Sequence, residues 1–247
     1  MSALFISDLH LSANQPDKVD AFKKLLNGPA KNFDELYLLG DLFEEFWVGN
    51  DDTTPPNPEI LQSLASLAIT QVKVFIVRGN RELLLDESFN VLTGVTVLPD
   101  MSVITINGEK ALIMHGDQLC TLDWKYQLFR KIMINKFLQA LIKVLPYDVR
   151  IQLAHGLRPG MTRHKNLKTD EIMDVAPETV EQMMKKFNVS LLIHGHTHKP
   201  GVHDLNIDNK FTKRIVLGDW YRKGEILISR EDKLELKGIN EFLHDAC

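Results

Sequence analysis

The sequence contains little cysteine and no long apolar run. Two cysteines occur in 247 residues, and so small a number excludes a disulfide framework and favours a reducing compartment. No apolar run approaches the roughly 18 to 20 residues that span a bilayer. The chain also reaches the charged Asp8 before the apolar core of a secretion signal could form. We therefore expect a cytoplasmic protein without an export signal or a membrane-spanning helix.

A general excess of positive charge is also missing, although one segment is strongly basic. The formal net charge of -4 offers no electrostatic attraction for nucleic acid, so we expect no nucleic-acid partner. Residues 124–168 nevertheless contain ten lysines and arginines against one acidic residue, Asp148. Positive charge gathered in one stretch favours an anionic partner for that stretch.

The pattern of apolar residues predicts a single domain, residues 1–247, of the α/β class. With 44% hydrophobic residues the chain can bury a full core. Short apolar runs predict buried strands at residues 3–7, 35–39, 72–77, 110–114, 190–193 and 214–217. Helical patterns lie between them at residues 17–27, 57–70 and 177–187. Hairpins are predicted within residues 104–114 and 226–236, so we expect a mixed sheet or two packed sheets.

An insertion of about residues 124–168 interrupts this alternation. The pattern predicts two helical stretches separated near Pro146, with an apolar stripe on one side and basic residues elsewhere. The stripe consists of Leu128, Ile132, Phe137, Leu138, Leu141, Ile142 and Leu145. Two interpretations remain open. The helices either pack on the core as an amphipathic pair, or they receive an anionic, apolar ligand or lie on a membrane surface.

Five short polar fragments accompany the predicted strands. Because ligands at the carboxyl ends of strands converge on one edge of a sheet, fragments far apart in sequence can meet there. Together they supply the carboxylate, imidazole and amide groups that two divalent metal ions need. The candidate ligands are Asp8, His10, Asp41, Asn80, His115, His196 and His198.

The positions of these residues suggest how a first ion is held. Asp8 and His10 are two residues apart on an extended strand end, so their side chains point to the same side. His198 would complete this first site. Asp41, at the end of its own strand, is the candidate for a carboxylate that bridges both ions and shares their charges.

The second ion would be held by Asn80, His115 and His196. The neutral oxygen of the asparagine leaves the net charge of the site near zero or positive, which favours phosphate binding. Oxygen and nitrogen donors without thiolate suit Mn²⁺ rather than structural zinc. Two such ions roughly 3.5 to 4 Å apart lower the pKa of a shared water and orient it toward phosphorus. The residues therefore indicate metal-assisted phosphoester hydrolysis.

Arg81 follows Asn80 directly, so its backbone lies at the predicted metal edge. Its guanidinium could bind a phosphoryl oxygen and stabilise the transition state. We predict Asp41, Asn80, Arg81 and His115 as the catalytic residues.

Read in order, these fragments resemble the motifs of the calcineurin-like metallophosphoesterases. Longer stretches are similar to one family among them, the UDP-2,3-diacylglucosamine pyrophosphohydrolases of bacterial lipid A biosynthesis. They are residues 5–11, 39–44, 79–81, 114–121, 172–175 and 194–200. The resemblance covers nearly the whole chain. It implies a sandwich of mixed β-sheets flanked by helices, with the helical insertion as a lid.

The resemblance also implies an activity. With two Mn²⁺ per chain, water would attack the α-phosphorus of UDP-2,3-diacylglucosamine and release UMP and 2,3-diacylglucosamine 1-phosphate (lipid X). An apolar face of the insertion would bury acyl chains, at roughly 0.8 kcal/mol per CH₂, while its cations meet phosphates and the inner leaflet. We accordingly expect peripheral association with the cytoplasmic face of the inner membrane.

Substrate contacts and departures also follow from the resemblance. The implied substrate-binding residues are Asn80, Arg81, Asp123, Lys165, Lys168 and His196. The family has aspartate where Glu82 stands, and Met161 and Lys165 replace a small hydroxyl residue and another polar residue of its pocket. These departures leave the candidate metal ligands intact and concern selectivity for acyl chains or sugar.

Two other functions remain open at this point. One is a phosphodiesterase or nucleotide pyrophosphatase acting on a soluble substrate. The other is a metal-binding scaffold without catalytic activity, which would use the apolar helices to hold a protein partner.

Overall fold

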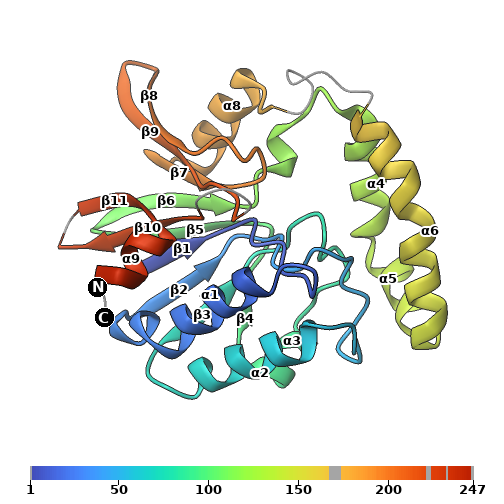
Figure 1. Ribbon diagram of the computed structural model, residues 1–247. Helices are drawn as coiled ribbons and strands as arrows, with labels where there is room; N and C mark the ends of the chain where they lie inside the picture. The colour runs from blue at the N-terminus through green and yellow to red at the C-terminus, as the bar shows by residue number, and fades with distance from the viewer. Residues whose placement is uncertain (1, 167–173, 221–223, 232, 246–247) are drawn as a thin grey trace.

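The computed structural model describes residues 2–166, 174–220, 224–231 and 233–245, with backbone only for 158–166. Two β-sheets pack together, and helices cover their outer faces (Figure 1). One sheet has the strand order β11-β10-β1-β2-β3-β4, and the other has the order β5-β6-β7-β9-β8. The α/β class and the pair of packed sheets predicted from the sequence are confirmed.

The strands have the following bounds. The first sheet contains β1 (Ala3–Ile6), β2 (Glu35–Leu38), β3 (Lys73–Ile76), β4 (Thr96–Val97), β10 (Glu225–Arg230) and β11 (Lys233–Gly238). The second contains β5 (Met101–Ile106), β6 (Glu109–Met114), β7 (Leu191–His194), β8 (Gly201–Ile207) and β9 (Lys210–Val216). Strands β1, β2 and β3 run parallel to one another, as do β6, β7 and β9. Within each sheet, therefore, their carboxyl ends lie at one edge.

The helices fall into three groups. Four pack on the first sheet, namely α1 (Pro16–Asn27), α2 (Asn57–Ala68), α3 (Ser88–Thr93) and α9 (Ile239–Asp245). One packs on the second sheet, α8 (Pro177–Phe187). The insertion forms α4 (Trp124–Met133), α5 (Lys136–Lys143) and α6 (Tyr147–Asn166), and two short 3-10 helices are η1 (Pro29–Asn32) and η2 (Asp117–Leu119). All six predicted strands, the three predicted helices and both hairpins are present.

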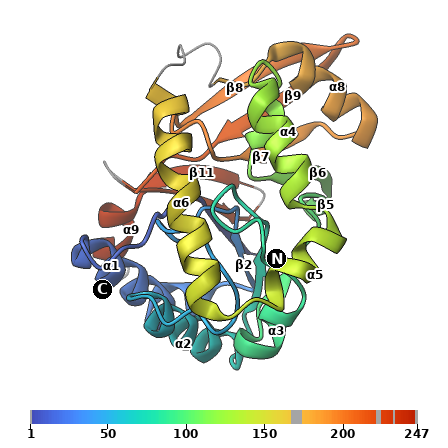
Figure 2. The same ribbon diagram turned by 90° about the vertical axis from the view of Figure 1, so that its right-hand side faces the viewer.

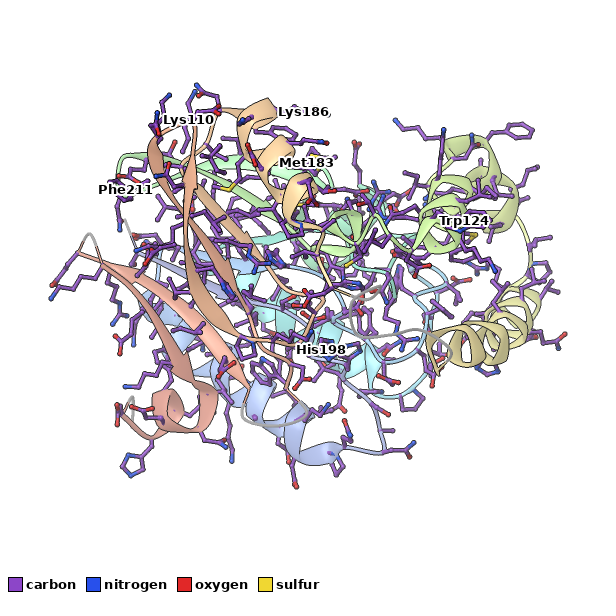
Figure 3. All side chains as sticks on the ribbon, turned by 90° about the horizontal axis from the view of Figure 1, so that it is seen from above. Lys110, Trp124, Met183, Lys186, His198 and Phe211 are labelled. Carbon is purple, nitrogen blue, oxygen red and sulfur yellow. The ribbon has the colours of Figure 1, made fainter. Side chains whose placement is uncertain are left out.

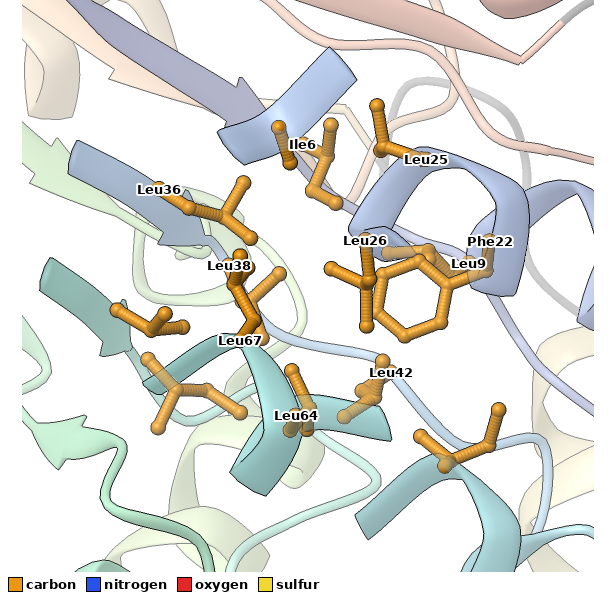
Figure 4. Packing of buried hydrophobic residues seen from close by; sticks show 14 of the residues in the cluster. Ile6, Leu9, Phe22, Leu25, Leu26, Leu36, Leu38, Leu42, Leu64 and Leu67 are labelled. Atoms are coloured by element: carbon orange, nitrogen blue, oxygen red, sulfur yellow. The ribbon is translucent and has the colours of Figure 1, made fainter. Parts of the chain in front are cut away.

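Strand β1 is buried on both faces, and its side chains alternate between two cores. Leu4 and Ile6 face the helices that cover the first sheet. Figure 4 shows this core, with Phe22 and Leu26 of α1 packed near Leu38. Ala3 and Phe5 belong instead to the core between the sheets. Because the central strands are enclosed in this way, their carboxyl-terminal loops start from a rigid base.

The insertion differs from the prediction in its number of helices. Three helices replace the two expected, because the chain breaks at Asn135 as well as near Pro146. The Asn135 side chain accepts hydrogen bonds from the backbone N–H of Phe137 and Leu138, at 3.0 and 3.1 Å, and so starts a new helix. The prediction overlooked this N-cap.

The predicted apolar stripe of the insertion is divided between two faces. Leu128, Ile132, Phe137 and Leu141 are exposed, whereas Ile142 lines a cavity described below. The views in Figures 1 and 2 agree that α4, α5 and α6 lie together on one side of the sheets. In the part of the chain that the structure describes, no helix combines the length and apolar character needed to cross a membrane.

Candidate metal centre

Five loops bring the seven candidate ligands to one edge of the sandwich. They follow β1, β2, β3, β6 and β7, and hydrogen bonds between their backbones hold them together. Asp8 N–H donates to Gly40 O at 3.0 Å, His10 N–H to Asp41 O at 2.9 Å, and Gly195 N–H to His115 O at 2.8 Å. In Figure 3, His198 lies between the sheets and the helical insertion, on which Trp124 is labelled.

Asp8, His10 and His198 form one group of donor atoms. The Nε2 atoms of His198 and His10 lie 3.3 and 3.9 Å from Asp8 Oδ1. The rings of the two histidines meet edge to face at 5.3 Å between centroids. These are the three residues that the sequence assigned to the first ion, and their ligand atoms lie within 4.8 Å of one another.

Asp41 lies between this group and a second one. Its Oδ2 is 3.7 Å from His10 Nε2, and its Oδ1 is 3.6 Å from His115 Nε2. The two oxygens of one carboxylate thus face donors of both groups. This is the arrangement that a bridging carboxylate requires.

Asn80, His115 and His196 form the second group. Asn80 Oδ1 lies 3.1 Å from His115 Nε2 and 3.1 Å from His196 Nδ1, and the two nitrogens are 3.2 Å apart. Two ligands about 2.1 Å from one ion and at right angles are separated by about 3 Å. The three atoms therefore fit the vertices of one coordination polyhedron. Oxygen and nitrogen donors of this kind fit a divalent transition metal.

The acidic and basic groups of the site shift one another's pKa values. Burial opposes the ionisation of His115, yet the carboxylates of Asp41 and Asp8 raise its pKa to about 9. Burial likewise opposes the ionisation of Asp8, yet the positive charge of His115 and the contact with His198 hold its pKa below the usual range. Burial and the nearby His115 lower the pKa of His196 to about 4, which keeps this imidazole neutral and able to coordinate.

Five of the seven candidate ligands have backbone φ angles in the left-handed region. These residues are Asp8, His10, Asp41, His196 and His198, with φ between 49° and 69°. Residues other than glycine adopt this backbone conformation at an energetic cost. Such strain is typical of functional sites whose surroundings enforce the geometry. Tight turns after the strands direct these donors inward.

Two glycines let the ligand loops approach closely. A Cβ atom on Gly79 would collide with the backbone nitrogen of Asp41, and one on Gly195 would collide with the side chains of Ser7 and Asp8. The close approach of the loops allows a hydrogen bond between them, which His196 N–H donates to Asp8 Oδ2 at 2.8 Å. Any side chain at either position would push the loops apart.

The outer ring nitrogens of three candidate ligands contact oxygen acceptors. His10 Nδ1 is 3.2 Å from Glu44 Oε2, and His198 Nδ1 is 2.9 Å from Asp219 Oδ2. His115 Nδ1 is 2.8 Å from the backbone oxygen of Leu39. Partners of this kind fix the tautomer and the ring orientation of a metal-binding histidine. The sequence analysis did not identify Glu44 or Asp219, although Gly218-Asp219 follows β9 just as Gly40-Asp41 follows β2.

Glu82 links two of these loops through hydrogen bonds to their backbone. Its buried carboxylate accepts hydrogen bonds from the backbone N–H groups of Asp41, Phe43 and Gly79, at 2.9, 3.0 and 3.2 Å. Burial and the Asp41 carboxylate raise the pKa of Glu82 to about 8, against the effect of these donors. The sequence linked this departure to substrate selectivity, but the Glu82 carboxylate contacts the loops of the metal site.

Arg81 stands between the metal centre and the insertion. Its backbone N–H donates to Asp41 Oδ1 at 3.0 Å, and its guanidinium lies 3.8 Å from Glu44 Oε1 and 5.4 Å from the centre of the Phe46 ring. It also lines a cavity of about 350 Å³. The other lining residues are mostly apolar and include Phe46, Trp47, Leu83, Phe129, Met133, Ile142, Leu153 and Leu157.

The remaining predicted substrate contacts lie in different places. Asn80 and His196 are in the metal centre, whereas Asp123 is buried and caps α4 by accepting from Tyr126 N–H at 3.2 Å. The side chains of Lys165 and Met161, and the whole of Lys168, lie outside the described residues.

The chain is similar to known proteins over most of its length. Residues 1–200 match the family model described as calcineurin-like phosphoesterase. A protein of Aeromonas hydrophila named UDP-2,3-diacylglucosamine hydrolase is 44% identical over 238 residues, which cover 95% of this chain and 98% of that protein. Proteins of the same name from Coxiella burnetii and Vibrio vulnificus are 45% and 42% identical and cover 93% and 96% of this chain, and 93% and 97% of their own lengths. Among solved structures, an archaeal phosphodiesterase superposes with a TM-score of 0.49 at 14% identity, covering 96% of this chain and 98% of that one.

Proposed function

Because the chain belongs to the calcineurin-like phosphoesterase family, we propose that it hydrolyses the pyrophosphate bond of UDP-2,3-diacylglucosamine. The products are UMP and 2,3-diacylglucosamine 1-phosphate, and the reaction belongs to lipid A biosynthesis. The names of the bacterial relatives support this substrate. The observation that carries the proposal is the mostly apolar cavity lined in part by Arg81, because a soluble nucleotide has no long apolar chain to fill it.

The residues of the site would divide the work as follows. Asp8, His10 and His198 would hold one ion, Asn80, His115 and His196 would hold the other, and Asp41 would contribute a carboxylate oxygen to each. A pair of divalent ions, when bound, acidifies water and neutralises charge on the phosphate. Arg81 places a guanidinium where it can bind a phosphoryl oxygen and counter the negative charge that grows in the transition state. Asn80 and His196 also touch the substrate, as does Asp123, and Lys165 and Lys168 add positive charge from the insertion.

We assign Mn²⁺ as the metal, two ions per chain. The donor set of carboxylate, imidazole and amide groups supports this choice, since thiolates are absent from the seven ligands. Metal titration of the stripped protein with Mn²⁺, Zn²⁺ and Mg²⁺, followed by activity measurement, tests both the identity and the number.

The insertion, about residues 124–168, would bind the lipid and place the protein on the cytoplasmic face of the inner membrane. It exposes large apolar residues, including Trp124 (64% exposed), Phe137 (74%) and Val144 (80%). The same segment carries the exposed lysines Lys125, Lys131 and Lys136. Exposed apolar and basic residues in one segment favour an interface with anionic lipid. Co-sedimentation with vesicles of anionic and of neutral phospholipid tests this association.

One assay tests the proposed reaction. Protein supplied with Mn²⁺ is expected to release UMP from UDP-2,3-diacylglucosamine, and metal-stripped protein is expected to release none. Phe129→Ser, which makes the cavity polar, should raise the KM for this lipid and leave the hydrolysis of bis(p-nitrophenyl) phosphate unchanged. Rapid turnover of soluble diesters without UMP release from the lipid would refute the proposal.

A further inference from the structure

In the part of the insertion whose side chains are described, each helix buries one polar side chain. Among the described side chains of residues 124–157, the buried ones are Arg130 (5% exposed) in α4, Gln139 (6%) in α5, and Arg150 (6%) with Ala154 (9%) in α6. Arginine and glutamine are usually exposed unless they are paired. Three helices of one insertion therefore share a feature that apolar packing does not explain.

Arg130 attaches α4 through two carboxylates, of which Asp117 is buried and Asp100 is partly buried. Its Nε donates to Asp117 Oδ2 and its second guanidinium nitrogen to Asp100 Oδ2, both at 2.6 Å. Asp100 also accepts from Arg78 at 2.7 Å. Asp117 stands two residues after the candidate ligand His115. Helix α4 is thus ion-paired to the loop that leaves β6 through the metal centre.

Gln139 and Arg150 attach the other two helices to backbone oxygens. Gln139 Nε2 donates to Leu83 O at 2.7 Å, two residues beyond Arg81. Arg150 donates to Val48 O at 2.7 Å and pairs with Asp51. The segment of Val48 is itself joined to Arg81, because Trp47 N–H donates to Arg81 O at 2.9 Å. Each helix is therefore fixed to a loop that carries, or directly touches, a residue of the candidate catalytic set.

Apolar residues of these three helices line the cavity and so can contact an apolar ligand. Phe129 and Met133 of α4, Ile142 of α5 and Leu153 of α6 line the cavity of about 350 Å³ instead of packing against the sheets. A lining of this kind is stabilised once an apolar ligand replaces water in the cavity. The polar contacts must hold the helices in place before the ligand arrives.

We propose that Arg130, Gln139 and Arg150 are positioning residues for the lipid substrate. They set the distance between the helical insertion and the metal centre through polar contacts, and so keep the apolar walls of the cavity free for acyl chains. This inference rests on the proposed function, because it takes the acyl chains of that substrate as the occupant. Binding of a long-chain lipid then depends on the contacts of these three residues. Hydrolysis of a soluble phosphodiester, which reaches only the metal centre, does not depend on them.

The test uses Gln139→Leu and Arg150→Met. Arg130 is less suitable, because its removal would leave the buried Asp117 carboxylate without its cationic partner and endanger folding. The expected result is a rise of about tenfold in the KM for UDP-2,3-diacylglucosamine with two long acyl chains, the factor that corresponds to 1.4 kcal/mol at 25 °C. Turnover of bis(p-nitrophenyl) phosphate and the affinity for Mn²⁺ should stay within about twofold. Arg150→Lys keeps a donor and should recover part of the loss.

Matched controls are Gln182→Leu and Lys186→Met on α8, where both side chains are exposed. They remove an amide group and a positive charge from a helix outside the insertion and should behave as wild type toward both substrates. The proposal would be overturned if the Gln139 and Arg150 variants lost activity equally toward the lipid and toward the soluble diester, since a general structural defect produces that result.

A measurement without substrate separates this inference from the proposed reaction. In Gln139→Leu, the amide hydrogens of α5 should exchange with deuterium about tenfold faster than in wild type, while those of α1 and α2 stay unchanged. Unchanged exchange in α5 would overturn the positioning role even if UMP is released. Faster amide exchange in α5 of Gln139→Leu, together with no UMP release by the wild type, would refute the proposed lipid hydrolysis. The contact of Gln139 would then still position α5.

Discussion

Side chains around the metal centre divide into those that direct donor atoms inward and those that hold the donors. Asp41 belongs to the first kind, with one oxygen toward each group of donors. Glu44, Asp219 and Glu82 belong to the second kind, because they contact the outer side of ligating residues or the backbone of their loops. Substitutions in the two groups should therefore fail in different ways.

Arg81→Ala should separate metal binding from turnover. A guanidinium has no lone pair to offer a metal ion, so the affinity for Mn²⁺ should stay within about threefold, while the loss of a charged group near the transition state lowers kcat by about 100-fold. Calorimetric titration with Mn²⁺ and the rate of UMP release measure the two effects. A variant with wild-type kcat would contradict the assignment, and Arg81→Lys, which keeps the charge but not the fork, should lie between the two.

Glu82→Gln should weaken both the fold and the metal site. A glutamine offers one acceptor oxygen in place of two, so a buried N–H of Asp41, Phe43 or Gly79 loses its partner, at a cost of about 1–3 kcal/mol. We expect a lower free energy of unfolding in urea and about tenfold weaker Mn²⁺ binding, within the range for loss of a group that supports a ligand. Glu87→Gln, at an exposed position, is the control. Equal stability and metal affinity in both variants would show that the three hydrogen bonds contribute nothing.

Among the secondary-structure elements, the strands and the insertion helices depend on different forces. Strand β1 is buried by apolar side chains on both faces. Helix α5 has a single buried residue, Gln139, and begins with a cap from Asn135. Short isolated helices are marginal in water, so a polar cap matters more in α5 than it would in a helix of the core.

Asn135→Ala should destabilise α5 selectively. The substitution removes an acceptor for two backbone N–H groups at the start of the helix and costs about 1 kcal/mol. Amide hydrogens of α5 should exchange faster by about fivefold, with the exchange of α2 unchanged. Asn135→Ser retains an acceptor and should restore slow exchange. If the amide hydrogens of α5 exchange as slowly in Asn135→Ala as in the wild type, the Asn135 cap is not what starts the helix.

Across the whole molecule, the metal centre joins loops from both sheets. The loops after β1, β2 and β3 come from the first sheet, and those after β6 and β7 come from the second. Ions held between them would therefore act as a link between the two halves of the sandwich.

Removal of metal should lower the thermal stability of the entire protein. A ligand that binds only the folded state stabilises it by about 2.7 kcal/mol at 100 times its Kd, and for a chain of this size that corresponds to about 5–10 °C in Tm. Calorimetric scans with excess Mn²⁺ and with a chelator measure the difference. Asp41→Ala, which removes the bridge, should show no Mn²⁺-dependent change in Tm and no activity. A Tm of the wild type that does not respond to metal would argue against a site formed across the sheets.

The sequence by itself was sufficient to predict the α/β class, the central strands and the seven candidate ligands. Strands buried on both faces leave continuous apolar runs, and polar residues directly after such runs stand out. The same reasoning missed Asp219 and the supporting role of Glu82, because a residue that holds a ligand from behind has no distinctive spacing. It also missed the break at Asn135, a local capping signal inside an apolar, basic stretch.

Only the tertiary structure decided how these parts meet. The left-handed turns at five ligands, the approach of Gly79 to Asp41 and the division of Asp41 between two donor groups depend on loops from two sheets packed against each other. The burial of Arg130, Gln139 and Arg150 depends likewise on partners far away in the chain. Periodicity reports which face of an element is apolar, but hydrogen bonds and charges act over a few ångströms, so their partners are set by packing.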